Sequence, residues 1–177
     1  MKHALYQSDR GSQIAEAALV LPLVFLFMLG IFWFGRAYNI YATLTHAARE
    51  GNRLSTQPLC ATCGNTVATA DSVADRISAA LLAAHLDPTQ VTSQPASMCA
   101  CSNQSCGGSY VACESVSGGK AQVCIQGNVA LYSYPGAVAP CGNMVSLQYP
   151  FQVHLPFTSF NLEKINIRTQ VQMGGNN

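Results

Sequence analysis

One feature constrains the fold more than any other, an uncharged apolar run of 19 residues over Ala17–Gly35. A helix rises about 1.5 Å per residue, so a helix over this run would be about 28 Å long. That length is close to the roughly 30 Å hydrocarbon core of a bilayer. A signal peptide has a shorter apolar region and a small-x-small cleavage triplet, and the following segment RAYN contains none. We therefore predict a retained membrane span over 17–35.

The cysteines indicate on which side of the membrane the rest of the chain lies. All eight follow the apolar run, and their even number is typical of disulfides formed in an oxidising compartment. We expect a single-pass protein of the cytoplasmic membrane, with its N-terminus inside and residues 57–177 outside. Eight cysteines allow on the order of 100 pairings, so the pairing stays open. The expected disulfide cysteines are Cys60, Cys63, Cys99, Cys101, Cys106, Cys113, Cys124 and Cys141.

Composition and motifs argue against several classes of function. Nine basic and eight acidic residues leave a net charge of +1, without a run of Lys or Arg that could follow a nucleic-acid backbone. Nucleophile-elbow, zinc-protease and phosphate-loop motifs do not occur. Cys60-x-x-Cys63 could be a redox pair or half a zinc site, but we favour structural disulfides because no strand is predicted before it. We expect no enzyme, no cofactor, no metal and no nucleic-acid partner.

Two acidic features have competing interpretations. Glu16 opens the apolar run, and a charge carried to mid-bilayer costs roughly 2.5 to 3.5 kcal/mol. It either lies among the headgroups, where it complements the helix dipole, or serves a function that needs an acid there. Asp71 and Asp75 share one helix face, and a solvated face is favoured over a catalytic acid pair.

The segment RGSQIAE, Arg10–Glu16, together with three later motifs resembles type IV pilins and pseudopilins. The resemblance is closest to the TadE-like proteins of the tight-adherence (Flp) pilus system. The later motifs are EAALVLPL with Pro22 inside the apolar run, FGRAY over 34–38 and THAAREGNR over 45–53. The resemblance implies that a prepilin peptidase cuts between Gly11 and Ser12, which makes 1–11 a cytoplasmic leader and Glu16 the assembly acid.

The resemblance also implies a function and partners. The chain would be a minor pilin, or pseudopilin, that takes part in assembling an adhesive pilus. Its partners would be inner-membrane lipid, the prepilin peptidase, other pilin subunits and the assembly machinery, with homo- or hetero-oligomers formed through the N-terminal helix. Two alternatives remain open, a major filament-forming subunit and a membrane-anchored extracytoplasmic binding or redox protein.

A physical hypothesis explains why an acid would be useful at Glu16. Cleavage would give Ser12 a new α-amino group, whose ordinary pKa near 8 leaves it largely cationic at neutral pH. The amine of a neighbouring subunit could then neutralise the Glu16 carboxylate as the helices pack, which would fix their register.

Periodicity predicts an α+β fold stabilised by disulfides. A long helix over 12–56 carries an apolar stripe, for which packing on the protein's own domain is favoured over contact with a sister helix. Pro22 should kink this helix. The stripe consists of Ala37, Ile40, Leu44, Ala47, Gly51 and Leu54.

A second helix and a small antiparallel sheet are predicted downstream. The helix should run over 66–86, capped by Asn65 or Thr66 and ended by Asp87-Pro88. The Cys-rich loop 93–119 has too few large apolar residues to form a core of its own. Pro150 and Pro156 argue for an edge strand or a break. The strands should cover 121–125, 129–134, 144–155 and 164–171.

Overall fold

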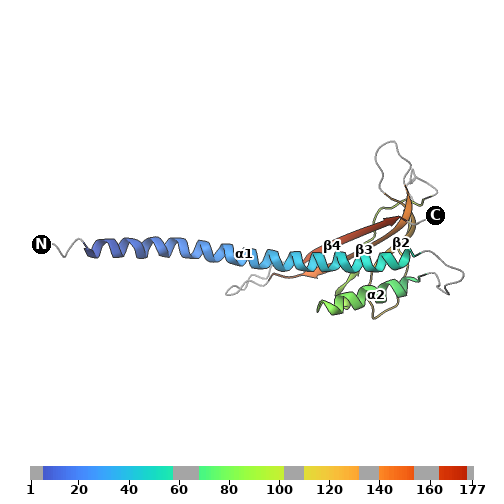
Figure 1. The fold of residues 1–177 in the computed structure, drawn as a ribbon, viewed down its shortest axis with the longest axis horizontal. Coiled ribbons are helices and arrows are strands. Elements are labelled where there is room, and N and C mark those ends of the chain that lie inside the picture. The colour runs from blue at the N-terminus through green and yellow to red at the C-terminus, as the bar shows by residue number, and fades with distance from the viewer. Residues whose placement is uncertain (1–5, 58–67, 102–109, 132–139, 154–163, 175–177) are drawn as a thin grey trace. The chain divides into compact units, whose positions relative to one another are not determined.

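The computed structural model describes residues 6–57, 68–101, 110–131, 140–153 and 164–174. The chain divides into two compact units, Met1–Asn39 and Ile40–Asn177. The predicted α+β class is confirmed, with two helices and an antiparallel sheet (Figure 1). The elements are α1 (Tyr6–Ser55), α2 (Ala70–Ala83), the 3-10 helix η1 (Pro88–Gln90), β1 (Thr92–Ser93), β2 (Cys124–Ala130), β3 (Cys141–Phe151) and β4 (Ile165–Gly174).

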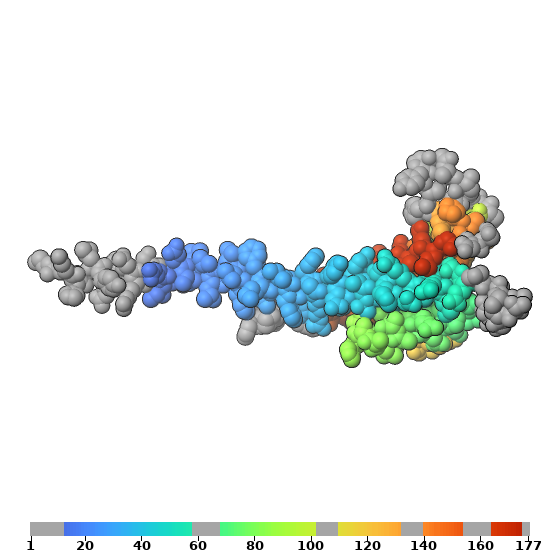
Figure 2. All heavy atoms as spheres, viewed as in Figure 1, coloured from blue at the N-terminus to red at the C-terminus, as the bar shows by residue number. Residues whose placement is uncertain are grey.

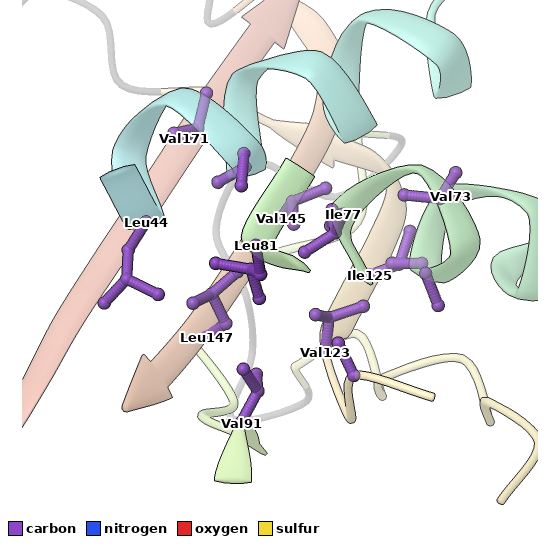
Figure 3. Close-up of a cluster of buried hydrophobic side chains, with 14 of the residues drawn as sticks. Leu44, Val73, Ile77, Leu81, Val91, Val123, Ile125, Val145, Leu147 and Val171 are labelled. Carbon is purple, nitrogen blue, oxygen red and sulfur yellow. The ribbon is translucent and has the colours of Figure 1, made fainter. Parts of the chain in front are cut away.

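In the second unit, α1 from Ile40 onward and α2 pack on one sheet. Figure 2 shows this part of α1 between α2 and β4. The side chains of both helices meet those of the strands in one apolar core (Figure 3). The predicted stripe therefore packs on the protein's own domain from Ile40 to Leu54. The buried residues of the core include Leu44 and Ala47 of α1, Val73, Ile77 and Leu81 of α2, and Val123, Ile125, Val145, Leu147 and Val171.

Gly51 lets α1 and α2 approach closely. A Cβ atom placed on Gly51 would lie 2.6 Å from Cγ1 of Ile77 and 3.2 Å from Cγ1 of Val73. Both distances are shorter than an ordinary carbon contact of about 3.5 to 4.0 Å. A side chain at this point would therefore force Ile77 or one of the two helices to shift.

The sheet is organised around β3. β4 pairs with it antiparallel over 142–151, whereas β2 and β1 pair with its residues 141–146 and 147–148. The prediction of two strands over 121–125 and 129–134 is wrong, because the chain continues through 124–130 as the single strand β2. A register shift between Gln126 and Val129 accommodates Asn128, whose φ is 51°. This bulge interrupts the alternation that the sequence displays.

The prolines do not make β3 an edge strand. β3 is paired with other strands on both of its sides over residues 142–148, which corrects the expectation of an edge strand drawn from Pro150. Pro150 is tolerated because, among the described strands, only β4 pairs with β3 at this position, opposite Asn166. A residue that lacks an N–H therefore loses no bond on the other side. Pro156 lies outside the described residues.

The second helix is shorter at both ends than predicted. Thr69 caps α2, and its side chain accepts a hydrogen bond from the Ser72 backbone N–H at 3.3 Å. The expected caps Asn65 and Thr66 lie outside the described residues. The helix ends at Ala83 because His85 adopts φ 59° and the Leu86 N–H returns to the Leu81 carbonyl.

Two disulfides attach the Cys-rich loop to the sheet. Cys101 is bonded to Cys141 at the start of β3, and Cys113 is bonded to Cys124 at the start of β2. Their Cα atoms are 5.5 and 4.9 Å apart. Cys99 is also disulfide-bonded. These bonds confirm the predicted stabilisation by disulfides, while Cys60, Cys63 and Cys106 lie outside the described residues.

Candidate membrane and assembly site

The apolar run forms a helical surface that is exposed on all sides. Leu19, Ile31 and Phe34 retain 75%, 73% and 75% of their accessible surface. An exposed apolar surface of this size is unfavourable in water. It is typical of segments that contact lipid or other helices. Among the described residues one helix, over Gln13–Ser55, is long and apolar enough to cross a membrane. The criterion is length and composition, and both fit a single-pass anchor.

The expected processing and assembly residues lie on the first turns of α1. Gly11 and Ser12 are within the helix backbone, which begins at Tyr6. Glu16 is four residues after Ser12, so the two positions share one helix face on successive turns. The Glu16 side chain is exposed. This arrangement presents the carboxylate outward from α1, where a second molecule could reach it.

Pro22 lies inside α1, and the helix continues through it. Its ring removes one backbone donor, a loss that membrane helices tolerate better than soluble ones. Pro22 lies six positions after Glu16, within the apolar part of the segment.

A cation and two aromatic rings meet at the other end of the run. The Arg36 guanidinium carbon lies 5.7 Å from the centroid of the Trp33 ring, within cation–π range. The Phe32 and Trp33 rings meet edge to face with centroids 5.6 Å apart. Sequence reasoning missed this group, although an aromatic residue and an arginine at i and i+3 are a recognisable signal.

The comparison with known families identifies this part of the chain. Residues 11–53 match the TadE-like protein family. The match starts at Gly11 and ends at Arg53, so it covers the first expected motif apart from Arg10 and all of the last. No curated protein and no solved structure matches the chain. The predicted resemblance is thus confirmed over this TadE-like segment, and it suggests a pilin-like protein associated with a Tad pilus.

The last motif of the TadE-like segment, THAAREGNR, packs α1 against the sheet. Ala47, Ala48 and Gly51 are buried, and their small size brings the helix close to its neighbours. Asn52 is fully buried and donates hydrogen bonds from Nδ2 to the Val171 carbonyl at 2.9 Å and to the Asn143 carbonyl at 3.2 Å. This end of the segment therefore serves the fold of the second unit.

Asn52 is a residue that the sequence analysis missed. Ser55 Oγ donates to Asn52 Oδ1 at 2.9 Å, and Asn143 Nδ2 donates to the Ser55 carbonyl at 2.9 Å. The polar atoms at the end of α1 are thereby bonded to β3 and β4. The only sequence signal was an asparagine one turn after Ala48 on an otherwise apolar face.

The acidic pair on α2 binds the loop before β2. The Asp71 carboxylate accepts hydrogen bonds from the Ser117 N–H at 2.8 Å and hydroxyl at 2.7 Å, which hold its pKa below the usual value. Asp75 pairs with Lys120 at 2.8 Å, and this pair raises the pKa of Lys120. The expected solvated face holds for Asp75, which is exposed, and each carboxylate in addition has its own partner on the loop.

A metal centre is not formed by the part of the chain described here, in which no group of three potential ligands lies together. His46 is exposed on α1 and borders a shallow hollow of about 390 Å³. The remaining lining is made of small residues: Ala42, Thr43, Ala80, Ala83 and Ala84.

Proposed function

We propose that the chain is a membrane-inserted, pilin-like subunit that is processed after Gly11 and takes part in assembly of an adhesive tight-adherence pilus. One observation carries the proposal, the TadE-like match that starts at Gly11 and runs through the exposed apolar helix. The subunit is inserted in the inner membrane with residues 57–177 on the extracytoplasmic side, where the cysteines can form disulfides. It acts by contact with other subunits and with the assembly machinery rather than by catalysis.

In this proposal the peptidase hydrolyses the bond between Gly11 and Ser12. Glycine is the weakest ordinary helix former, by about 1 kcal/mol relative to alanine, so α1 unwinds more easily around Gly11 than elsewhere in the leader. Local unwinding would present the bond in the extended form that a protease active site can bind. The new Ser12 amine then lies one turn before Glu16.

Glu16 is the proposed assembly acid. Its side chain is exposed, and the apolar run of α1 begins directly after it. A cationic amine from the next subunit would neutralise it, and opposite charges interact more strongly where water is excluded. A subunit packed out of register would leave the carboxylate without this partner, so the pair selects one register.

A minor subunit is proposed rather than the main filament subunit. The proposal draws on the size of the extracytoplasmic unit, with its sheet, second helix and disulfides. A short filament subunit could be little more than the helix itself. The stoichiometry of the protein in sheared pili separates the two roles, because a main subunit would be the most abundant chain.

Processing is tested by mass spectrometry and N-terminal sequencing of the membrane-extracted protein, produced with and without a prepilin peptidase. The expected result is a new N-terminus at Ser12 only when the peptidase is present. Gly11→Val should block this cleavage. The matched control is Gly30→Val on the same helix, where a new Cβ contacts nothing within 4 Å and cleavage should be unchanged. An unprocessed Met1 terminus beside active peptidase would refute the proposal.

The assembly role is tested separately with processed protein. Glu16→Ala should be cleaved normally and lose incorporation into sheared pili. Glu50→Ala, which removes a carboxylate farther along α1, is the control and should leave incorporation unchanged. Normal incorporation of Glu16→Ala would remove the acid from the mechanism and leave the processing proposal standing.

A further inference from the structure

We propose that Trp33 and Arg36 form a binding site for a phospholipid headgroup that fixes the depth of α1 in the extracytoplasmic leaflet. In this site the Arg36 guanidinium binds the lipid phosphate, and the Trp33 indole lies at the boundary between headgroups and acyl chains. The inference depends on the membrane insertion proposed above. It adds to that proposal a ligand, two residues and a defined depth.

The first argument is the geometry of the pair. The Trp33 ring lies below the Arg36 guanidinium at 5.7 Å, which restricts an otherwise flexible side chain. Arginine offers five N–H donors in a planar fork that matches two oxygens of a phosphate. Arg36 is exposed, and none of the carboxylates in the described ranges pairs with it. The guanidinium is thus oriented by an aromatic ring and has donors available for an anion.

The second argument is the position of the pair along the helix. Arg36 is the first charged residue after Glu16, and their separation of 20 positions corresponds to about 30 Å of helix. That length equals the approximate thickness of the hydrocarbon core. With Arg36 at the phosphates of one leaflet, Glu16 lies at the opposite interface and its carboxylate stays hydrated. The cost of a charge at mid-bilayer is then avoided before assembly.

The third argument is the type of residue at this end. Trp and Tyr are enriched at membrane interfaces because one part of each side chain is apolar and the other is polar. Trp33 is followed by Tyr38, which is 65% exposed. Phe32, which precedes Trp33 in the apolar run, packs edge to face on the Trp33 ring. The order from apolar ring to amphipathic ring to cation follows the polarity profile of a leaflet.

The experiment uses the single tryptophan of the chain as a depth probe. The full-length protein is reconstituted in phosphatidylcholine vesicles that contain phosphatidylglycerol and a brominated lipid. The bromine lies close to the headgroup, in the middle of the acyl chain or at its end. We expect the bromine nearest the headgroup to quench Trp33 most. In Arg36→Gln the shallow position should lose roughly fivefold in population, the effect of one cation near an anionic surface.

Two further variants make the test specific. Arg36→Lys keeps the charge without the planar fork and should give an intermediate depth. Arg49→Gln removes an exposed arginine from α1 beyond the proposed site and should leave the depth unchanged. Strongest quenching by chain-end bromine, or an unchanged depth in Arg36→Gln, would overturn the headgroup site while membrane insertion stands. A tryptophan quenched by aqueous iodide and by none of the lipids would instead refute insertion itself.

Discussion

The two units use one helix in two ways. Before Asn39, α1 has large apolar side chains on every face, and most of them are exposed. From Ile40 onward, one face is buried and consists mainly of small residues, with Leu44 as its largest member. Large side chains without protein neighbours indicate an apolar solvent, whereas small buried ones indicate close packing within the protein. The difference shows that a long apolar helix need not have one role along its length.

The largest effect is expected when one leucine is truncated in each of the two parts of α1. Leu44 is fully buried among α2 and the sheet, so Leu44→Ala should lower the free energy of unfolding of the second unit by about 2 to 5 kcal/mol. Leu26 is 70% exposed, and Leu26→Ala should leave that free energy unchanged. The measurement is hydrogen exchange at the slowest amides of β3 in the full chain held in lipid discs. Equal losses in both variants would mean that the two stretches are not distinct.

A second test adds volume instead of removing it. In Gly51→Ala the new Cβ would lie within 3 Å of Ile77, and overpacking of this kind costs about 1 to 3 kcal/mol. Gly35→Ala on the same helix adds a methyl group to open space and should leave the second unit as stable as before. The same exchange measurement distinguishes them. A stable Gly51→Ala protein would show that α1 and α2 are not tightly packed.

A third test concerns the buried amide. Asn52→Ala leaves the Val171 and Asn143 carbonyls without this donor and should cost about 1 to 3 kcal/mol. Asn39→Ala removes an exposed amide of α1 and is the control. Exchange should accelerate across the paired residues of β3 and β4 in Asn52→Ala alone. Unchanged exchange there would mean that water replaces the lost donor without loss.

Much of this fold could be predicted because its periodicities are strong. The apolar run, the stripe from Ile40 to Leu54 and the alternation along β3 each gave the correct element. The bulge at Asn128 could not be predicted, because one extra residue in β2 relative to β3 changes the pairing without changing which residues are apolar. The end of α2 depends on the left-handed conformation of His85, for which the sequence has no glycine signal.

The residues of the candidate site also divide into those that the sequence predicts and those that it does not. Gly11, Ser12 and Glu16 follow from an ordered motif and remain predictions, to be tested by cleavage and assembly. Trp33 and Arg36 were missed because a cation–π contact depends on side-chain direction as well as on spacing. Asn52 was missed because its partners, Asn143 and Val171, are 91 and 119 residues away in the sequence. Contacts of that range follow from the packing of α1 on the sheet.

The smallest expected effect is a pH dependence in the second unit. The backbone N–H and the hydroxyl of Ser117 both donate to the Asp71 carboxylate, and these bonds lower its pKa from the usual 3.8. A carboxyl whose pKa is lower in the folded state contributes stability above its unfolded value, and this contribution is lost as the pH falls through the folded value. The wild-type protein should therefore lose stability below about pH 4 more steeply than Asp71→Asn. Unfolding followed by hydrogen exchange over this range measures the slope.

Ser117→Ala provides the control for the cause of this effect. It removes the hydroxyl donor and keeps the backbone N–H, which is the larger of the two causes of the lowered pKa. Its slope below pH 4 should lie between those of the wild type and Asp71→Asn. The double variant should have the slope of Asp71→Asn alone, because the hydroxyl then has no carboxylate to act on. A separate, additive effect of Ser117→Ala would show that the serine stabilises the loop by another route. The Asp71–Ser117 contact would then not be the cause of the pH dependence.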